Sequence, residues 1–267
     1  MRLDFLVMGA QKSGTTALAY FLMQHPEIYI PPDKEIHFFD YEPHFKDRGS
    51  IDYTKYHEYF DVPTGARVVG EATPIYMYWR PARERIKQYN PSIKMVFILR
   101  NPIDRAYSHF RWFQRMTGKQ GSTFSVALRL ERIRRLRAYP RQTRQYSYID
   151  RGYYARQIRR LLEQFSLSQM LFIKTEDLRD NHESTLYRVF DFLGVSRVSY
   201  IEPARINDNQ YPPMSESDRM YLLKKFEKDI GDLEKLLSWD CSNWLTPPQL
   251  SAGQFEEECS GVAEGTS

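Results

Sequence analysis

The side chains best suited to bind an anion lie in one short turn near the N-terminus. Apolar runs at 3–8 and 17–23 flank a turn that reads Gln11-Lys12-Ser13-Gly14-Thr15-Thr16. A strand that passes through such a turn into a helix leaves backbone amides unpaired at the positive end of the helix dipole. The lysine and the hydroxyl groups add hydrogen-bond donors that suit a phosphate. The turn therefore predicts a phosphate site.

The order of residues separates this turn from the common nucleotide-binding loop. In that loop the lysine directly follows a glycine, whereas Lys12 here precedes Gly14. This order weakens the case for a kinase or another nucleotide triphosphatase. A small-molecule kinase that uses ATP and Mg²⁺ remains the enzymatic alternative. A polar turn without a ligand would also explain the segment taken alone.

Two more polar segments follow apolar runs. Residues 71–76 come after a strand expected at 67–70, and residues 100–108 come after the clearest buried strand, at 93–99. In parallel sheets, ligands bind beyond the carboxyl ends of the strands. We therefore expect these two segments and residues 9–16 to line one site.

The elements that must position these segments alternate between strand and helix. The apolar pattern predicts further strands at 27–30 and 170–173, and helices at 53–60, 81–89, 103–116, 124–137, 154–165, 186–193 and 218–237. This alternation favours an α/β fold with a central, mostly parallel sheet, helices on both faces and a P-loop-like strand–loop–helix. We expect a single domain at 1–250 and a disordered tail at 251–267, where residues are small and polar.

The bulk composition is that of an ordinary soluble globular protein. The 267 residues can build one substantial domain, with 42% hydrophobic and 27% charged residues. The net charge of +4 would suit a polyanionic cofactor or an acidic acceptor, but it is too small to indicate nucleic acid. No apolar run has the length of a transmembrane helix, so we expect no membrane partner.

The N-terminus and the cysteines indicate the cellular compartment. Met1 leads directly into the first strand, without a signal peptide. Cys241 and Cys259 are the only cysteines, and Cys259 lies in the polar tail. A disulfide framework is therefore not expected, and a reducing compartment fits better. These features predict a cytoplasmic protein.

Residues 11–18 and 100–108, in this order and spacing, resemble two motifs of the sulfotransferases that use 3′-phosphoadenosine-5′-phosphosulfate (PAPS). The first is similar to the loop that binds the 5′-phosphosulfate, and the second to the motif that binds the 3′-phosphate. Three other segments are similar to parts of the heparan sulfate sulfotransferase branch: 34–40, 71–76 and 151–155. The resemblance implies PAPS as the sulfuryl donor, PAP as the product and no metal.

The resemblance implies roles for residues of the donor site. Lys12 would act in catalysis by contacting the 5′-phosphate and the bridging oxygen of the leaving group. Arg100 and Ser108 would hold the 3′-phosphate, which distinguishes PAPS from ordinary nucleotides, although Arg100 could instead pair with Asp104. The other residues expected at the nucleotide are Ser13, Gly14, Thr15, Thr16, Ala17, Tyr153, Asn209 and Tyr211.

The resemblance also implies roles at the acceptor. Glu35 matches the proposed general base, and His37 and Asp40 match polar residues of the acceptor site. If this segment is extended, Glu35, His37 and Phe39 share one face, and His37 is the second candidate for the base. The other residues expected near the acceptor are Tyr76, His109 and Trp112.

Simpler explanations stand beside these roles. Glu35 could be a surface turn residue, His37 a structural histidine and Asp40 the cap of the next segment. The acceptor itself is a matter of expectation: we favour a small-molecule metabolite from natural product biosynthesis, and a carbohydrate-like acceptor would also suit the many aromatic side chains.

One segment departs from the Golgi members of this family, which carry a luminal disulfide and a loop rich in lysine and arginine. The matching stretch, at 205–212, has Arg205 as its only basic residue and no flanking cysteine pair. In this respect the chain resembles the soluble bacterial sulfotransferases.

A run of arginines at 129–144 has several explanations. A nucleic-acid-binding module would use such a run against phosphates. The run could also dock an acidic acceptor, or form a solvated helix face above a core stripe of Leu128, Ile133 and Leu136. We favour the solvated face and expect no nucleic-acid partner.

Overall fold

A parallel sheet forms the centre of the molecule. The computed structural model describes residues 2–46, 51–118, 122–139, 142–198, 201 and 211–246. The five strands stand in the order β2-β3-β1-β4-β5. They are β1 (Phe5–Gly9), β2 (Ile28–Tyr29), β3 (Val68–Glu71), β4 (Lys94–Leu99) and β5 (Met170–Lys174). Their pairings are parallel, which confirms the predicted α/β fold.

The helices connect the strands in chain order. Those before β4 are α1 (Thr15–Met23), α2 (Thr54–His57) and α3 (Arg80–Tyr89). Between β4 and β5 lie α4 (Pro102–Thr117), α5 (Phe124–Ala138) and α6 (Tyr154–Leu162). After β5 come α7 (Thr175–Asp180), α8 (His182–Leu193), α9 (Glu216–Leu237) and α10 (Ser242–Leu245). Short 3₁₀ helices occupy Glu42–Phe45, Asp150–Gly152 and Leu167–Gln169.

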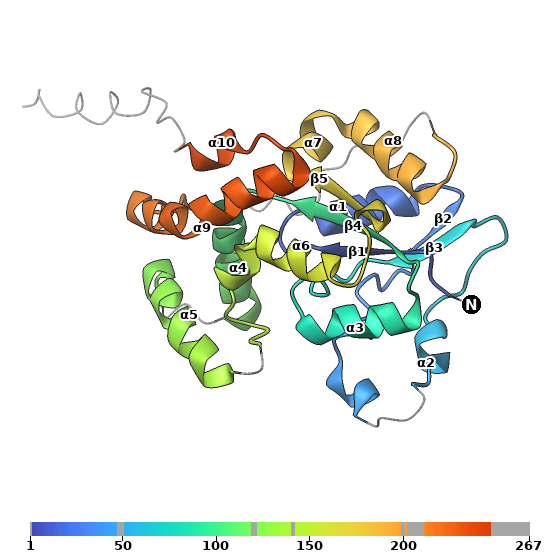
Figure 1. Ribbon diagram of the computed structural model, residues 1–267, viewed down its shortest axis with the longest axis horizontal. Coiled ribbons are helices and arrows are strands. Elements are labelled where there is room, and N and C mark those ends of the chain that lie inside the picture. The colour runs from blue at the N-terminus through green and yellow to red at the C-terminus, as the bar shows by residue number, and fades with distance from the viewer. Residues whose placement is uncertain are drawn as a thin grey trace, which may run out of the picture.

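Side chains of β1 alternate between two apolar cores. Phe5 and Val7 belong to the core that contains the buried residues of α1, α7 and α8. Leu6 and Met8 belong to the core that contains those of α3, α4, α6 and α9. Figure 1 shows α7 and α8 on one side of the sheet and α3 and α6 on the other. Burial on both faces explains why these strands are apolar except at their ends, such as Glu71, Lys94 and Lys174.

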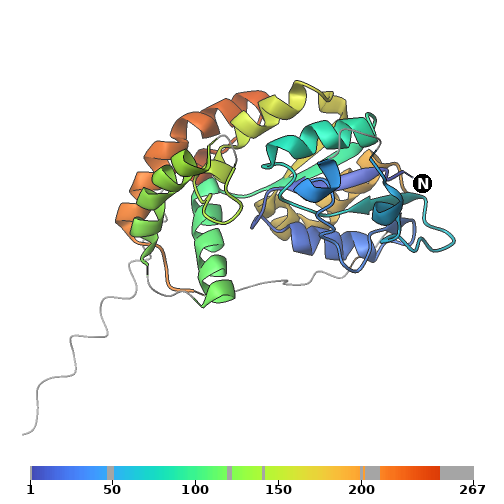
Figure 2. The same cartoon turned by 90° about the horizontal axis from the view of Figure 1, so that it is seen from below.

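Helices α4, α5 and α9 lie together beyond the carboxyl end of β4 (Figures 1 and 2). Helix α4 begins directly after the strand, because Pro102 occupies its first turn and the Asn101 side chain accepts a hydrogen bond from the amide of Ile103 (2.9 Å). The chain before α6 approaches α9 closely at Gly152, where a Cβ atom would lie 2.5 Å from the Phe226 ring. The candidate site lies where this helical group meets the strand ends.

The core stripe that the sequence predicted on α5 is wrong at two positions. Ile133 and Leu136 are 47% and 69% exposed, whereas Leu128 is buried. The buried face of α5 is a different one, whose residues still recur at helical spacing: Phe124, Ala127, Leu128 and Glu131. A charged residue thus takes the core-facing position, which the apolar pattern did not reveal.

Other expectations held with smaller changes. The helix expected at 53–60 is confined to α2, and the strand expected at 27–30 to β2. The tail predicted at 251–267 lies outside the described residues. Among the described residues, no helix is both long enough and apolar enough to span a membrane.

Candidate active site

The loop after β1 has the form of an anion-binding turn. The amide of Ala10 donates to the carbonyl oxygen of Ile98 in β4 (2.7 Å), and the amide of Ser13 to that of Ala10 (3.1 Å). Gly14 has φ 101°, in the left-handed region, and a Cβ atom there would lie 3.3 Å from Ile98. Helix α1 then starts without a side-chain cap. Its first amides are therefore available to a ligand.

Ser13 carries an unpaired hydroxyl in this loop. The residue is fully buried, and its Oγ has no hydrogen-bond partner among the described residues. The Tyr154 hydroxyl lies close enough for a contact with Ser13 to lower its pKa, but it donates its own hydrogen to the carbonyl oxygen of Arg100 (2.9 Å). Thr15 is also buried, whereas Thr16 and Ala17 are partly exposed. Because buried polar groups are normally paired, the Ser13 hydroxyl fits a site that a phosphate completes.

Thr175, at the start of α7, ties the loops after two strands together. Its hydroxyl lies 2.6 Å from the carbonyl oxygen of Ser13 and 3.1 Å from that of Leu99, the last residue of β4. This residue has no signature in the sequence, because a lone threonine after a strand has no distinctive pattern. The contact holds the phosphate loop against the residue before Arg100.

Lys12 and Arg100 lie in one positively charged neighbourhood. Burial lowers the pKa of Lys12, and the nearby charges of Arg115 and Arg100 lower it further. Lys34 acts in the same direction, and Glu35 opposes it. So many cations around one lysine favour a bound anion. The two groups predicted to hold the two phosphates of the nucleotide thus share one electrostatic environment.

For the other described residues predicted at the nucleotide, the structure shows burial or packing against other side chains. Ser108 is nearly buried on α4. Tyr153 packs its ring against Phe226 (5.3 Å) and Arg156 (4.5 Å), and Tyr211 packs against Tyr107 (5.4 Å). Asn209 lies outside the described residues. Contacts of these residues with a nucleotide stay predictions.

Glu35, His37 and Asp40 form a series of contacts just before the 3₁₀ helix Glu42–Phe45. The Nε2 atom of His37 lies 3.5 Å from Glu35, and its Nδ1 atom lies 3.1 Å from Asp40. Lys34 also binds Glu35, at 2.6 Å. The sequence predicted an extended segment with Glu35, His37 and Phe39 on one face. The segment is not extended, because His37 has φ 59°, and Phe39 is buried in the core.

The contacts among Glu35, His37 and Asp40 set the protonation states of Glu35 and His37. Hydrogen bonds to Asp40 and then to Glu35 raise the pKa of His37 to about 9. Burial alone would raise the pKa of Glu35, but its hydrogen bonds with His37 and Lys34 outweigh burial, and the pKa is lowered. At neutral pH the carboxylate is therefore ionised and the imidazole protonated.

Glu71, at the carboxyl end of β3, is a buried acid that the sequence assigned no role. It is fully buried. By distance and angle neither carboxyl oxygen has a hydrogen-bond partner within the described residues, although the hydroxyls of Tyr76 and Tyr56 lie near enough to offset part of the effect of burial on its pKa. Burial raises its pKa to about 8. The predicted acceptor residue Tyr76 is also fully buried, and its hydroxyl accepts from the amide of Phe39 (3.3 Å). This position makes Tyr76 a core residue, and an acceptor contact stays a prediction.

The predicted acceptor residues on α4 stand beside Lys12. The Lys12 ammonium lies 5.7 Å from the ring centre of Trp112, and the rings of Trp112 and His109 are 6.0 Å apart. His109 is fully buried, and both its ring nitrogens lack a partner in the described part of the chain. Burial, followed by the charges of Arg151, Arg105 and Lys12, holds the pKa of His109 well below its usual range. This imidazole is neutral.

The described residues contain no cluster of three or more histidine, cysteine, aspartate or glutamate side chains that could hold a metal ion. Two arginines that the sequence did not assign also reach the site. Arg144 binds Asp40, and Arg151 binds Gln11 of the phosphate loop.

Comparison with known proteins places this geometry in context. A family model described as the sulfotransferase domain matches residues 2–225. Bifunctional heparan sulfate N-deacetylase/N-sulfotransferase 3 of Mus musculus is 30% identical over 268 residues, which cover 87% of this chain and 29% of that protein. Heparan sulfate glucosamine 3-O-sulfotransferase 6 of Homo sapiens is 31% identical over 194 residues, which cover 72% of this chain and 52% of that protein.

One solved structure matches a larger share of this chain. The crystal structure of a sulfotransferase from Alicyclobacillus acidocaldarius has 31% sequence identity and a TM-score of 0.79, and the match covers 92% of this chain and all of that one. By contrast, this chain spans less than a third of the length of the N-deacetylase/N-sulfotransferases that it matches.

Proposed function

The chain belongs to the sulfotransferase family, and on that premise we propose that it moves the sulfuryl group of PAPS to a hydroxyl or amine of an acceptor. The observation that carries this proposal is the anion site around the phosphate loop. There the uncapped start of α1, the unpaired hydroxyl of Ser13 and the cations Lys12 and Arg100 come together.

The donor-side residues would lower the barrier by fixed charge and position. In the reaction, the acceptor atom forms a bond to sulfur while the bond from sulfur to the bridging phosphate oxygen breaks. Lys12 and the first amides of α1 stabilise the negative charge that grows on that oxygen. Ser13, Gly14, Thr15, Thr16 and Ala17 hold the 5′-phosphate, and Arg100 with Ser108 holds the 3′-phosphate. Because these donors are preorganised, they need no rearrangement during transfer.

Glu35 is the general base in this proposal. A base must be unprotonated, and the lowered pKa of Glu35 keeps its carboxylate ionised. The pKa of His37 is about 9, so at neutral pH its ring is already protonated. His37 therefore orients Glu35 and does not accept the proton of the acceptor. The proton of the acceptor would pass to Glu35 as the new bond to sulfur forms.

The acceptor and the setting are also proposed. The relatives named for heparan sulfate act on a carbohydrate, which supports a carbohydrate-like or small-molecule acceptor. A metabolite of natural product biosynthesis, a cytoplasmic location and a domain spanning 1–250 stay predictions. A metal-free reaction also stays a prediction.

The arginine run gives little support to the nucleic-acid alternative. Arg134 lies over the Tyr146 ring (4.1 Å), Arg135 pairs with Asp150 (3.1 Å), and Arg144 binds Asp40. Arg141 lies outside the described residues. Three arginines of the run are thus engaged within the molecule, and fewer remain for phosphates.

A binding and transfer experiment tests the proposal. We expect the protein to bind PAP in calorimetry without Mg²⁺, and to transfer ³⁵S from labelled PAPS to members of a panel of hydroxyl- and amine-bearing saccharides and metabolites. Lys12→Met should weaken PAP binding at least tenfold. Binding of ATP with Mg²⁺ in preference to PAP would replace this proposal with the kinase alternative.

A further inference from the structure

The segment between α5 and α6 contacts both sides of the candidate site. Near its start, the Arg144 guanidinium binds both the carboxylate and the carbonyl oxygen of Asp40. At its end, the Arg151 guanidinium binds the side-chain oxygen of Gln11, next to Lys12. The segment 34–40, which carries Glu35, follows β2, whereas the phosphate loop follows β1, so their spacing depends on what joins them.

The two arginines are also joined to each other. The Nη2 atom of Arg151 donates to the carbonyl oxygen of Arg144 at 2.5 Å, and its Nε atom donates to the hydroxyl of Ser147 at 2.8 Å. Its guanidinium lies 4.7 Å from the ring centre of Tyr78. Arg151 is only 3% exposed. Such a buried guanidinium, with hydrogen bonds in several directions, has little freedom to move.

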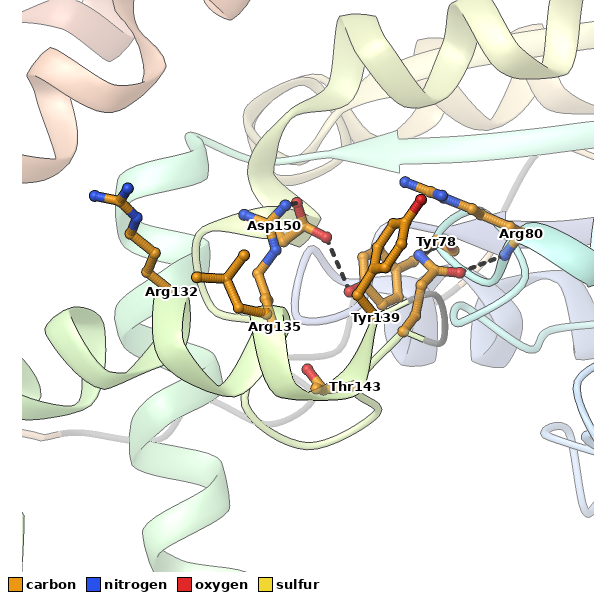
Figure 3. Close-up of a pocket in the computed structure, with 9 residues that line it drawn as sticks. Tyr78, Arg80, Arg132, Arg135, Tyr139, Thr143 and Asp150 are labelled. Atoms are coloured by element: carbon orange, nitrogen blue, oxygen red, sulfur yellow. Dashed lines mark hydrogen bonds and ion pairs between the residues drawn. The ribbon is translucent and has the colours of Figure 1, made fainter.

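The segment is anchored from the side away from the phosphate loop. The buried carboxylate of Glu131 in α5 accepts the amides of Ile149 (2.8 Å) and Asp150 (2.9 Å). Asp150 accepts the hydroxyl of Tyr78 (3.0 Å) and pairs with Arg135 (3.1 Å), contacts visible in Figure 3. These contacts also line a hollow of about 280 Å³ between α5 and residues 78–80. The segment is therefore fixed before any ligand binds.

We propose that residues 144–151 form a strut that sets the distance between the general base and the sulfuryl donor, with Arg144 and Arg151 as positioning residues. This inference rests on the proposed function. The chain of contacts runs from Gln11 through Arg151 and Arg144 to Asp40, and Asp40 in turn holds His37, which contacts Glu35. In-line transfer depends on sub-ångström placement, and the strut supplies it without touching the reacting atoms.

The two ends of the strut predict separable effects. Gln11→Ala removes only the contact with the phosphate loop, so we expect PAP to bind about tenfold more weakly while His37 keeps its pKa. Arg144→Leu removes the contact with Asp40 and the stacking of the guanidinium on the Trp79 ring (4.5 Å), and leaves the contact with Gln11 in place. We expect the pKa of His37 to fall by at least one unit, as followed by NMR, while the PAP affinity changes less than twofold. Arg151→Lys, at the centre, should change both.

The direction of the His37 shift separates positioning from charge alone. Asp40 and Glu35 are the carboxylates in contact with His37, and the acid Glu71 lies near them. If Arg144 acted only as a distant cation, its removal would raise the pKa of His37. If it holds Asp40 in place, its removal frees that carboxylate to move away from His37, and the pKa of His37 falls. A rise or no change in Arg144→Leu would overturn the proposal.

Controls separate this test from folding and from the proposed function. Arg137→Leu alters an exposed arginine of α5 and should leave both readouts unchanged. Arg144→Lys keeps the charge but cannot hold two oxygens in a fork, so it should give an intermediate His37 shift even if Arg144→Leu proves unstable. If the unaltered protein fails to bind PAP, the proposed function fails. If it binds PAP but Gln11→Ala binds equally well, the strut fails.

Discussion

The hydroxyl of Thr175 lies 2.6 Å from the carbonyl oxygen of Ser13, across a sequence separation that no local pattern bridges. The same hydroxyl lies 3.1 Å from the carbonyl oxygen of Leu99. One side chain after β5 thus holds the turn after β1 beside the end of β4. The phosphate loop and the segment that starts at Arg100 form one unit through this contact.

Thr175→Val should loosen that unit. Valine keeps the shape of the side chain but leaves two carbonyl oxygens without this donor. We expect the free energy of unfolding to fall by about 1–2 kcal/mol, and PAP binding in calorimetry to weaken about fivefold. Thr185→Val removes a comparable hydrogen bond, to the carbonyl oxygen of Asp177 (3.1 Å), away from the loop. It should cost similar stability and leave PAP binding unchanged, and an equal loss of PAP affinity in both variants would contradict the role given to Thr175.

Glu35→Gln should separate chemistry from donor binding. Glutamine has nearly the shape of glutamate but cannot accept a proton at neutral pH. We expect PAP affinity to stay within threefold and turnover with PAPS to fall at least about a hundredfold, within the range that a general base contributes. The measurement is the initial rate of ³⁵S transfer to an acceptor identified in the panel. Unchanged turnover would transfer the role of base to His109, whose imidazole is neutral.

His37 should make stability depend on pH. Its pKa in the folded protein, about 9, lies above the ordinary value of 6.5. Its contribution to stability is therefore complete below pH 6.5 and is lost as the pH rises to about 9. The difference in unfolding free energy between the unaltered protein and His37→Gln, measured by urea denaturation, should shrink across this interval.

His44 supplies a control with the opposite sign. Burial lowers the pKa of His44, so the protein should lose stability relative to His44→Gln as the pH falls below about 6.5. Parallel pH profiles for the two variants would contradict the assignment of His37 as a cation held by two carboxylates.

Glu71 should destabilise the protein as the pH rises. Its pKa of about 8 in the fold exceeds the ordinary value of 4.5, so ionisation favours the unfolded chain from pH 4.5 up to about 8. We expect the free energy of unfolding of Glu71→Gln, relative to that of the unaltered protein, to rise by at least about 2 kcal/mol between pH 5 and pH 8. The exposed residue Glu84 provides the control, since Glu84→Gln should show no such gain. A constant difference across this range would mean that a ligand or ion pair compensates the carboxylate.

The sequence by itself determined the fold class and the family. Runs such as 93–99, apolar at all positions but Lys94, indicate strands of a sheet that is covered on both faces. The order of Lys12 and Gly14, together with the spacing to Arg100 and Ser108, specified the donor motifs. Patterns of this kind are local. They can be read from the sequence because the backbone geometry of a turn or strand end depends on its own residues.

Only the tertiary structure decided how those motifs are held together and which groups carry charge. The link from Thr175 to Ser13 and the contact between Arg151 and Gln11 join residues more than a hundred positions apart, and no spacing rule predicts such pairs. Glu131 faces inward on α5 because its carboxylate meets two amides of the strut, against the apolar pattern of the helix. His37 owes its raised pKa to the carboxylates of Asp40 and Glu35, and Glu71 owes its raised pKa to burial; both causes exist only in three dimensions.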